Sequence, residues 1–303
     1  MTLFVVGNVT EDIVFVLPHL PAHGETLIAE SRLSDIGGKG LNQALIAGRC
    51  GMKVRLIAPI GRDEAGRRAR KIVAAEPLDA AFVEKDGPTD QSIISVGRNG
   101  DNHIISTAFA ASALTENDVM SAAPDAGPGD HLLMQGNLSL ETTGAVLRWA
   151  RAQGIGTTVN PSPIRWDYGP LWPLIDRLVL NRSELVALSG QDDLDGGVEA
   201  LASRGAGEII VTLGADGAVC SSGRHRHVVA AAPARVVDTA GAGDTFCGVF
   251  IAARDRGYDR PAALETAARA AAITIARSGT FSAFPSTQEL AALFVPFERE
   301  ATT

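Results

Sequence analysis

The stretch Val237-Asp-Thr-Ala-Gly-Ala-Gly-Asp-Thr-Phe246 joins an apolar strand end to an apolar helix that we expect over 244–255. Its small residues Gly241, Ala242 and Gly243 let a ligand approach the backbone closely. The first turn of a helix leaves amide N–H groups unpaired, and the helix dipole favours negative charge beside them. The stretch therefore predicts an anion hole for a phosphoryl group at a strand-to-helix junction of an α/β protein.

Asp244 follows this turn directly, and a carboxylate beside an anion hole can accept the proton of an attacking hydroxyl. The alternative is that Asp244 is only a helix N-cap and the glycines form an ordinary turn. Two aspartates, Asp238 and Asp244, flank Thr-Ala-Gly-Ala-Gly, which is more than a cap requires. We therefore interpret Asp244 as a catalytic base, kept ionised at neutral pH by the helix N-terminus.

A second glycine-rich stretch, Ile36-Gly-Gly-Lys-Gly-Leu-Asn-Gln-Ala44, precedes another helix. Gly38 and its neighbours again permit close backbone approach, and Lys39 and Asn42 offer donors suited to hydroxyl groups. The stretch is not a Walker loop, because it lacks the four residues between glycines and the Ser or Thr after Lys. Its simpler interpretation is a glycine-rich strand-to-helix turn.

Short apolar runs alternate with helical stretches along most of the chain. The runs predicted as strands are Leu3–Val6, Val54–Pro59, His131–Gln135, Gly156–Asn160, Arg177–Leu180 and Glu208–Leu213. The stretches predicted as helices are Asn42–Arg49, Glu64–Ala75, Leu140–Gln153, Arg182–Leu188, Gly197–Arg204, Asp244–Asp255, Pro261–Ala276 and Thr287–Leu293. Runs that are apolar on both faces are typical of a parallel sheet covered by helices. The alternation predicts a doubly wound α/β fold with a mostly parallel sheet.

Two segments break this alternation. Residues 12–33 read as extended, and residues 92–108 alternate in polarity with a hairpin turn at Asn99-Gly100. They either pair into a small second sheet that covers the main one as a lid, or extend the main sheet at one edge. Spacing alone does not choose between these two arrangements.

Three shorter patterns lie at predicted strand ends, where ligands bind in open α/β sheets. Thr10-Glu11-Asp12 follows the first strand, and Thr212-Leu-Gly-Ala-Asp-Gly217 is a glycine turn that is weak evidence alone. Asn181-Arg-Ser-Glu184 begins a helix, so Asn181 is either an N-cap or, with Glu184, close to a hydrated Mg²⁺.

Charge and composition exclude several classes of partner. The chain has 303 residues, 35 of them acidic and 27 basic, for a net charge of −8. This balance disfavours nucleic acid or an anionic membrane as the main partner, because both require a basic face. No stretch resembles a signal peptide or a membrane span, and the three cysteines form no disulfide framework. We expect a cytoplasmic protein.

Taken together, these stretches resemble the ribokinase-like (phosphofructokinase-B) family of sugar kinases, from Val6 to about Pro285. The C-terminal signature of that family matches Asp238-Thr-Ala-Gly-Ala-Gly-Asp244. The Gly-Gly-Lys-Gly-Leu-Asn-Gln-Ala form of the N-terminal signature, Pro21–Thr26 and Asn160–Pro163 are most similar to the ribokinase branch. The resemblance implies one kinase domain over residues 1–303 with a small β-sheet lid.

The resemblance also implies a role for each matching residue. Asp244 would be the base, with Gly241, Ala242 and Gly243 around the transferring phosphoryl group. The residues around the sugar would be Thr10, Asp12, Gly38, Lys39, Asn42, Asn137 and Asp244. The residues that serve ATP and Mg²⁺ would be Asn181, Glu184, Thr212, Gly214, Asp216 and Gly217. The residues around a monovalent cation, K⁺, would be Asp238, Ala240, Thr274, Arg277 and Gly279, mostly through backbone carbonyls.

Three positions depart from the usual pattern of ribokinases. Thr10 replaces an Asn, Asn137 replaces a Glu, and Ala283 replaces a Ser that often completes the cation site. The first two leave the identity of the sugar open, and the third weakens the cation site.

The expected reaction is transfer of the ATP γ-phosphoryl group to a primary hydroxyl of a small sugar such as ribose. The alternatives are a kinase for another sugar, sugar acid or nucleoside, and a catalytically silent sugar-binding regulator. A nicotinamide-dependent enzyme is disfavoured, because Gly7-Asn-Val-Thr-Glu-Asp12 lacks the dinucleotide fingerprint. Apolar residues on both faces of the lid segments, such as Ile13, Phe15, Ile94 and Ile104, predict a homodimer that pairs two lids.

Overall fold

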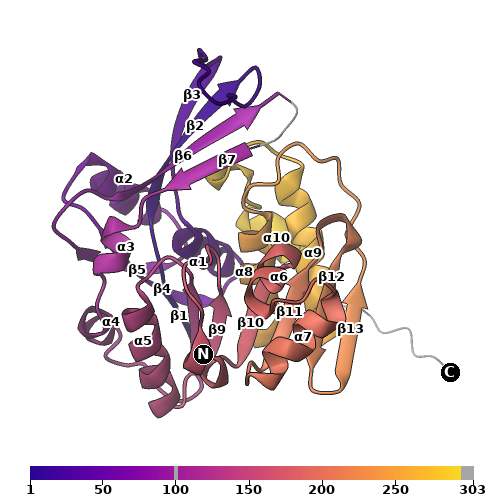
Figure 1. Ribbon diagram of the computed structural model, residues 1–303. Helices are drawn as coiled ribbons and strands as arrows, with labels where there is room; N and C mark the ends of the chain where they lie inside the picture. The colour runs from indigo at the N-terminus through magenta and orange to yellow at the C-terminus, as the bar shows by residue number, and fades with distance from the viewer. Residues whose placement is uncertain (99–101, 295–303) are drawn as a thin grey trace.

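A computed structural model describes residues 1–98 and 102–294, which form two separate sheets (Figure 1). In the larger sheet nine strands lie in the order β13-β12-β11-β10-β9-β8-β1-β4-β5. Its strands are β1 (Thr2–Val6), β4 (Lys53–Ile60), β5 (Asp79–Glu84), β8 (His131–Gln135), β9 (Gly156–Asn160), β10 (Arg177–Asn181), β11 (Glu208–Thr212), β12 (Ala218–Ser222) and β13 (His225–Val229). Only β12 and β13 run antiparallel to their neighbours. The predicted doubly wound, mostly parallel α/β sheet is confirmed.

Alternate residues of each central strand face two different helical layers. On β1, Leu3 and Val5 pack into one core, whereas Phe4 and Val6 pack into the other. The two-residue period of a strand sends successive side chains to opposite faces, so a strand that is apolar throughout serves both cores.

Each face of the large sheet has its own set of helices. The first layer contains α1 (Lys39–Arg49), α2 (Glu64–Val73), α8 (Ala242–Asp255), α9 (Arg260–Ile275) and α10 (Thr287–Leu293). The second contains α3 (Phe109–Ala113), α4 (Glu116–Ala122), α5 (Leu140–Ala152), α6 (Arg182–Ser189), α7 (Leu194–Ser203) and the 3₁₀ helix η1 (Gly169–Leu174). No helix within the described residues is both long and apolar enough to cross a membrane.

The smaller sheet stands over one end of the main body, at the top of Figure 1. Its four strands lie in the order β3-β2-β6-β7, with β2 at Thr10–Leu17, β3 at Ser31–Gly37, β6 at Asp90–Gly97 and β7 at Asn102–Ser106. The alternative in which these segments extend the main sheet is therefore wrong. β6 and β7 pair antiparallel as expected of a hairpin, whereas the predicted turn at Asn99-Gly100 lies outside the described residues.

Several elements differ from their predicted bounds. Helix α1 begins at Lys39, three residues before the predicted start, and α8 begins at Ala242, two residues before Asp244. The first turns of both helices were not predicted, because they contain or follow glycines and glycine is a poor helix former. In the small sheet β2 begins at Thr10 and β3 ends at Gly37, so Asp12 belongs to a strand of that sheet.

Candidate active site

The candidate site lies at the carboxyl edge of the large sheet, beside β1. The chain runs from β1 outward to β4 and β5 on one side, then returns to β8 on the other side of β1. Such a reversal leaves a crevice outside the strand ends, which is where ligands bind in open α/β sheets. The two glycine-rich motifs and the base of the small sheet meet at this edge.

Helices α1 and α8 cross closely below the site. A Cβ atom on Gly248 would lie 2.8 Å from Cγ2 of Ile46 and 3.0 Å from the carbonyl oxygen of Gln43. A glycine at this crossing lets the two helices approach to a distance that alanine would prevent. The starts of α1 and α8 also meet, because Asn42 and Gln43 of α1 bond to Asp244 of α8 across 202 and 201 residues of sequence.

Asp244 is buried at this meeting point, with 5% of its surface exposed. Asn42 Nδ2 donates to its Oδ2 at 2.9 Å, and Gln43 Nε2 donates to its Oδ1 at 2.8 Å. The Lys39 ammonium lies 3.8 Å from Oδ1. Gly241, rather than Asp244, occupies the N-cap position of α8, so the interpretation of Asp244 as a simple cap is wrong.

The turn before α8 requires a glycine at position 241. Gly241 has φ of 75°, in the left-handed region, and a Cβ atom there would lie 2.5 Å from Cε1 of Phe284. Gly243, by contrast, has open space where a side chain would point. The first turn of α8 thus presents backbone amides to a surface that a ligand can reach, as the anion-hole prediction requires.

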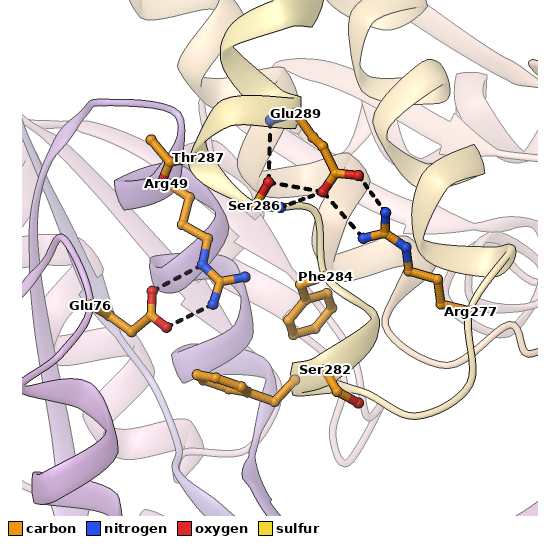
Figure 2. Close-up of a pocket in the computed structure, with 9 residues that line it drawn as sticks. Arg49, Glu76, Arg277, Ser282, Phe284, Ser286, Thr287 and Glu289 are labelled. Carbon is orange, nitrogen blue, oxygen red and sulfur yellow. Dashed lines mark hydrogen bonds and ion pairs between the residues drawn. The ribbon is translucent and has the colours of Figure 1, made fainter.

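The Phe284 ring also lines a cavity of about 490 Å³ behind this turn (Figure 2). Two ion pairs border the cavity, Arg49 with Glu76 at 2.7 Å and Arg277 with Glu289. Both guanidinium groups are paired, so neither offers a free positive charge to a ligand in this cavity. The Phe284 ring packs against the turn at Gly241.

Asp12 and Thr10 project from the base of the small sheet. Asp12 is 5% exposed, and its Oδ1 accepts a hydrogen bond of 2.6 Å from the Thr10 hydroxyl. Burial raises the pKa of Asp12 from 3.8 to about 6, although hydrogen bonds from Thr10 and Ser92 oppose that shift. Gly37 makes room for this carboxylate, since a Cβ atom there would lie 2.1 Å from Asp12 Oδ2.

Three buried amide oxygens around the site have no hydrogen-bond partner among the described residues. They are Oδ1 of Asn42, Oε1 of Gln135 and Oδ1 of Asn137, and all three side chains are at most 6% exposed. An unpaired buried acceptor is costly, so a donor from a ligand would stabilise each of them. Sugar hydroxyls are donors of that kind. The backbone carbonyl of Asn137 accepts a 2.7 Å hydrogen bond from Arg165.

The predicted nucleotide residues lie at the ends of two neighbouring strands, since Asn181 on β10 pairs with Thr212 on β11. Asn181 is the N-cap of α6 and forms a capping box with Glu184, so the capping interpretation of Asn181 is confirmed. The turn after β11 contains Gly214 with φ of 61° and Gly217 with φ of 90°, and Asp216 lies 3.6 Å from Arg182.

The predicted cation residues come from two segments that contact each other. The amides of Val237 and Asp238 both donate to the carbonyl oxygen of Ile275, on the segment that holds Thr274 and Arg277. The Asp238 carboxylate accepts from the amides of Ala240 at 2.9 Å and Gly279 at 3.1 Å. These contacts bring all five predicted positions to one side of the α8 turn.

Three buried polar residues of the site were not predicted as site residues: Gln43, Gln135 and Asn160. Gln43 contacts Asp244 directly, and the other two contact Gln43. Each carried a signal in the sequence, because a polar residue within an apolar helix or at the end of an apolar run requires a polar partner when buried.

Comparison with protein families matches residues 2–287 to a model described as pfkB family carbohydrate kinase. A ribokinase from Haemophilus influenzae is 31% identical over 297 residues, covering 95% of this chain and 96% of the relative. A deoxyribokinase from Salmonella typhi is 29% identical over 297 residues, covering 95% and 97%.

Comparison with solved structures finds the same fold. A ribokinase from Thermotoga maritima superposes with a TM-score of 0.86 at 27% identity, covering 97% of this chain and 99% of that one. Ribokinase from Arabidopsis thaliana, solved in complex with ribose and ATP, has a TM-score of 0.82 at 24% identity, covering 96% and 97%.

Proposed function

Because the chain belongs to the pfkB family of carbohydrate kinases, we propose that it transfers the γ-phosphoryl group of ATP to a primary hydroxyl of a small sugar, with ribose or a related pentose as the first candidate. The observation that carries the proposal is the buried Asp244 carboxylate in the first turn of α8, between an anion hole and the donors of α1. A silent sugar-binding regulator would have no use for a base at that position.

In the proposed reaction the sugar hydroxyl lies against Asp244 and gives its proton to that carboxylate. The hydroxyl oxygen forms a bond to the γ-phosphorus while the bond from that phosphorus to the β-phosphate oxygen breaks, and ADP leaves. Phosphoryl transfer has a loose transition state that requires little early proton removal, so a weak base suffices. Positioning and charge stabilisation then supply most of the rate.

The residues of this chain that stabilise charge come from both helix starts. We propose that the amides of Gly241 and Gly243 face the transferring oxygens, together with that of Ala242, which in the free protein makes a long hydrogen bond of 3.4 Å to the carbonyl oxygen of Thr239. The dipole of α8 adds positive potential there. Lys39, 3.8 Å from Asp244, contributes a mobile positive charge from α1. Its side chain is 36% exposed, so the ammonium group is accessible to a ligand at this edge of the sheet.

Mg²⁺ fits the oxygen-rich rim formed by Asn181 and Glu184, which we propose as its outer contacts. Mg²⁺ prefers oxygen ligands and keeps several of its waters, binding chiefly to substrate phosphates. Each side chain uses one oxygen in the capping box of α6, and an amide or carboxylate oxygen has further lone pairs for water. When bound, the ion would neutralise charge on the β- and γ-phosphates.

Assays of a panel of sugars with ATP and Mg²⁺ test the reaction. Similarity to both a ribokinase and a deoxyribokinase does not by itself identify the sugar that accepts the phosphoryl group, and Asn137→Glu tests what selects it. Asn137 offers both donor and acceptor, whereas an ionised Glu only accepts. We expect Asn137→Glu to shift preference toward ribose, measured as the ratio of kcat/KM for ribose to that for the best sugar of the panel. An unchanged ratio would show that position 137 does not touch the sugar.

Potassium is expected to raise activity over sodium. A cation between Asp238 and the 274–279 segment would fix the Gly241–Gly243 amides and add positive charge near the phosphates. Ala283 contributes no side-chain oxygen to that site, so we expect activation to be moderate. Initial rates in matched potassium, sodium and tetramethylammonium salts provide the measurement. Equal rates in all three would argue that the site is absent.

The protein is also proposed to be a cytoplasmic homodimer that pairs two small sheets. Ile104 and Ile105 are 55% and 73% exposed, so both faces of the edge strand β7 present apolar surface. Ile94, in contrast, is 7% exposed, and its side chain is not available to a partner. Pairing across a two-fold axis would cover the exposed residues.

We expect a dimeric mass by light scattering at micromolar concentration, and a monomeric mass for Ile105→Lys. A monomeric wild-type protein would contradict the proposal.

A further inference from the structure

A chain of buried side-chain amides connects the large sheet to the candidate base. Gln135, the last residue of β8, donates from Nε2 to Oε1 of Gln43 at 2.9 Å. Gln43 Nε2 donates both to Asn160 Oδ1 at 3.0 Å and to Asp244 Oδ1 at 2.8 Å. Asn160, the last residue of β9, donates in turn to the carbonyl oxygen of Val179 on β10 at 2.8 Å.

These contacts leave Gln43 a single amide orientation. Its two N–H groups are directed at two acceptors, and its one oxygen accepts from a donor. Exchanging oxygen and nitrogen would place oxygen against the oxygens of Asp244 and Asn160, and nitrogen against the nitrogen of Gln135. Gln43 and Gln135 are both fully buried, so water cannot compensate for a misdirected group.

We infer that Gln43 is a positioning residue that fixes the Asp244 carboxylate to the ends of β8 and β9 and, through Asn160, to β10, and keeps its Oδ1 an acceptor. The expected effects on kcat and KM rest on the proposed function, whereas the hydrogen bond from Gln43 to Asp244 does not depend on it. An amide N–H donates and cannot accept, so it can hold a carboxylate without taking its proton. Asn42 holds Oδ2 in the same way, but its own oxygen has no protein partner. Gln43 is therefore the side chain that connects Asp244 to residues of the large sheet, Gln135 and Asn160.

Three charged or titratable groups around Asp244 influence the ionisation of a carboxyl group placed at position 43. Lys39 lies 3.8 Å away on α1, Cys247 lies one turn further along α8, and the Asp12 carboxylate approaches from β2. Gln43 is neutral, so replacing it with Glu adds a carboxyl group of the same shape about 2.8 Å from Asp244 Oδ1. Two carboxyl groups so close cannot both ionise freely, and they share a proton over a wide pH range.

The test compares Gln43→Glu, Gln43→Leu and Thr158→Val with the wild type. Thr158→Val is the matched control, because it removes a partly buried 2.7 Å hydrogen bond to His131 from the same strand as Asn160 without touching Asp244. The first readout is a carbon-13 NMR titration of the Asp244 carboxyl group, assigned by its absence in Asp244→Ala. The second is the pH profile of kcat/KM with the best sugar of the panel.

For Gln43→Glu we expect the carboxyl titration and the acid limb of kcat/KM to move to higher pH by about one pH unit or more. For Gln43→Leu we expect kcat to fall by roughly 10- to 100-fold with the KM values for sugar and ATP within about threefold, as a misplaced base would cause. Thr158→Val should lower thermal stability but leave the pH profile unchanged.

The outcomes separate this inference from the proposed function. An unmoved Asp244 titration in Gln43→Glu, or a kcat in Gln43→Leu close to that of the wild type, would overturn the positioning role. If the wild type phosphorylates no sugar while the NMR titration still moves, the contact is correct and the kinase proposal is wrong. Should Gln43→Glu fail to fold, the kcat and KM of Gln43→Leu decide the question alone.

Discussion

Replacing Asp244 with alanine is expected to lower kcat by roughly 10²–10⁴, the usual contribution of a general base. The physical reason is the place of its carboxylate, held by Asn42 and Gln43 directly beside the amides of the α8 turn. The fold and ATP binding should persist, because the residues that we propose bind the nucleotide lie on β10, β11 and their loops. Steady-state kinetics, circular dichroism and ATP titration provide the measurements.

Asp193→Ala is the matched control for this variant. Asp193 also lies at a helix start, where its side chain caps α7 by accepting from Gly196 N at 2.7 Å. We expect it to lose some stability, on the order of 1 kcal/mol, with kcat unchanged. An Asp244→Ala enzyme within a few-fold of the wild type would remove Asp244 from the mechanism.

Replacing Asp12 with alanine is expected to raise KM for the sugar far more than KM for ATP. A carboxylate can accept from two vicinal hydroxyls at once, and charge-assisted hydrogen bonds are strong. Leaving a sugar hydroxyl unpaired in a closed site costs about 1–3 kcal/mol, or roughly 5- to 150-fold in affinity. Glu11→Ala is the control, because Glu11 is the neighbouring residue of β2 and instead bonds to Ser34 and Gln91. Equal effects of the two substitutions on KM for the sugar would exclude Asp12 from the sugar site.

The raised pKa of Asp12 makes this prediction depend on pH. The ionised form accepts from the sugar, so KM for the sugar should rise as pH falls through about 6.

The folded-state pKa of Asp12, about 6, lies above the ordinary value of 3.8, so burial of this group destabilises the free protein above pH 6 by up to about 3 kcal/mol. That penalty disappears as pH falls below about 4. Asp12→Asn should therefore unfold at a higher temperature than the wild type at pH 7.5, but not at pH 4.

Most of the large sheet could be predicted because its strands are apolar on both faces. The antiparallel edge formed by β12 and β13, and the outer strand β5, were not among the predicted strands. Residues of β5 such as Asp79 and Glu84 are exposed, and an edge strand with mixed polarity has no clear pattern. The short helix α3 was missed because its cap comes from a distant contact, the Asp90 carboxylate on β6. Helix α4 was missed although Thr115 and Asp118 form a local capping box at its start.

The candidate site was predictable where a residue type is unusual in its local context. Glycines before an apolar helix and aspartates beside them indicate ligand chemistry, and those motifs meet in the structure. Gln43 was not predicted as a site residue because its partners, Gln135, Asn160 and Asp244, lie on three other elements. A single sequence shows that a buried glutamine needs partners but does not show which ones. The raised pKa of Asp12 likewise follows from its burial at the base of the small sheet, which composition does not reveal.

The close crossing of α1 and α8 at Gly248 has a consequence for how this enzyme can be engineered. The crossing packs the two glycine-rich motifs, which we propose face the sugar and the phosphate, tightly against each other, so we expect that redesign of either one alone would misalign the other. The small sheet, in contrast, reaches the site mainly through the bases of its strands, such as Thr10 and Asp12 on β2. Exchange of substrate range between relatives should therefore succeed by grafting the small sheet and the loop at Asn137, while the helix pair is retained as an inherited unit.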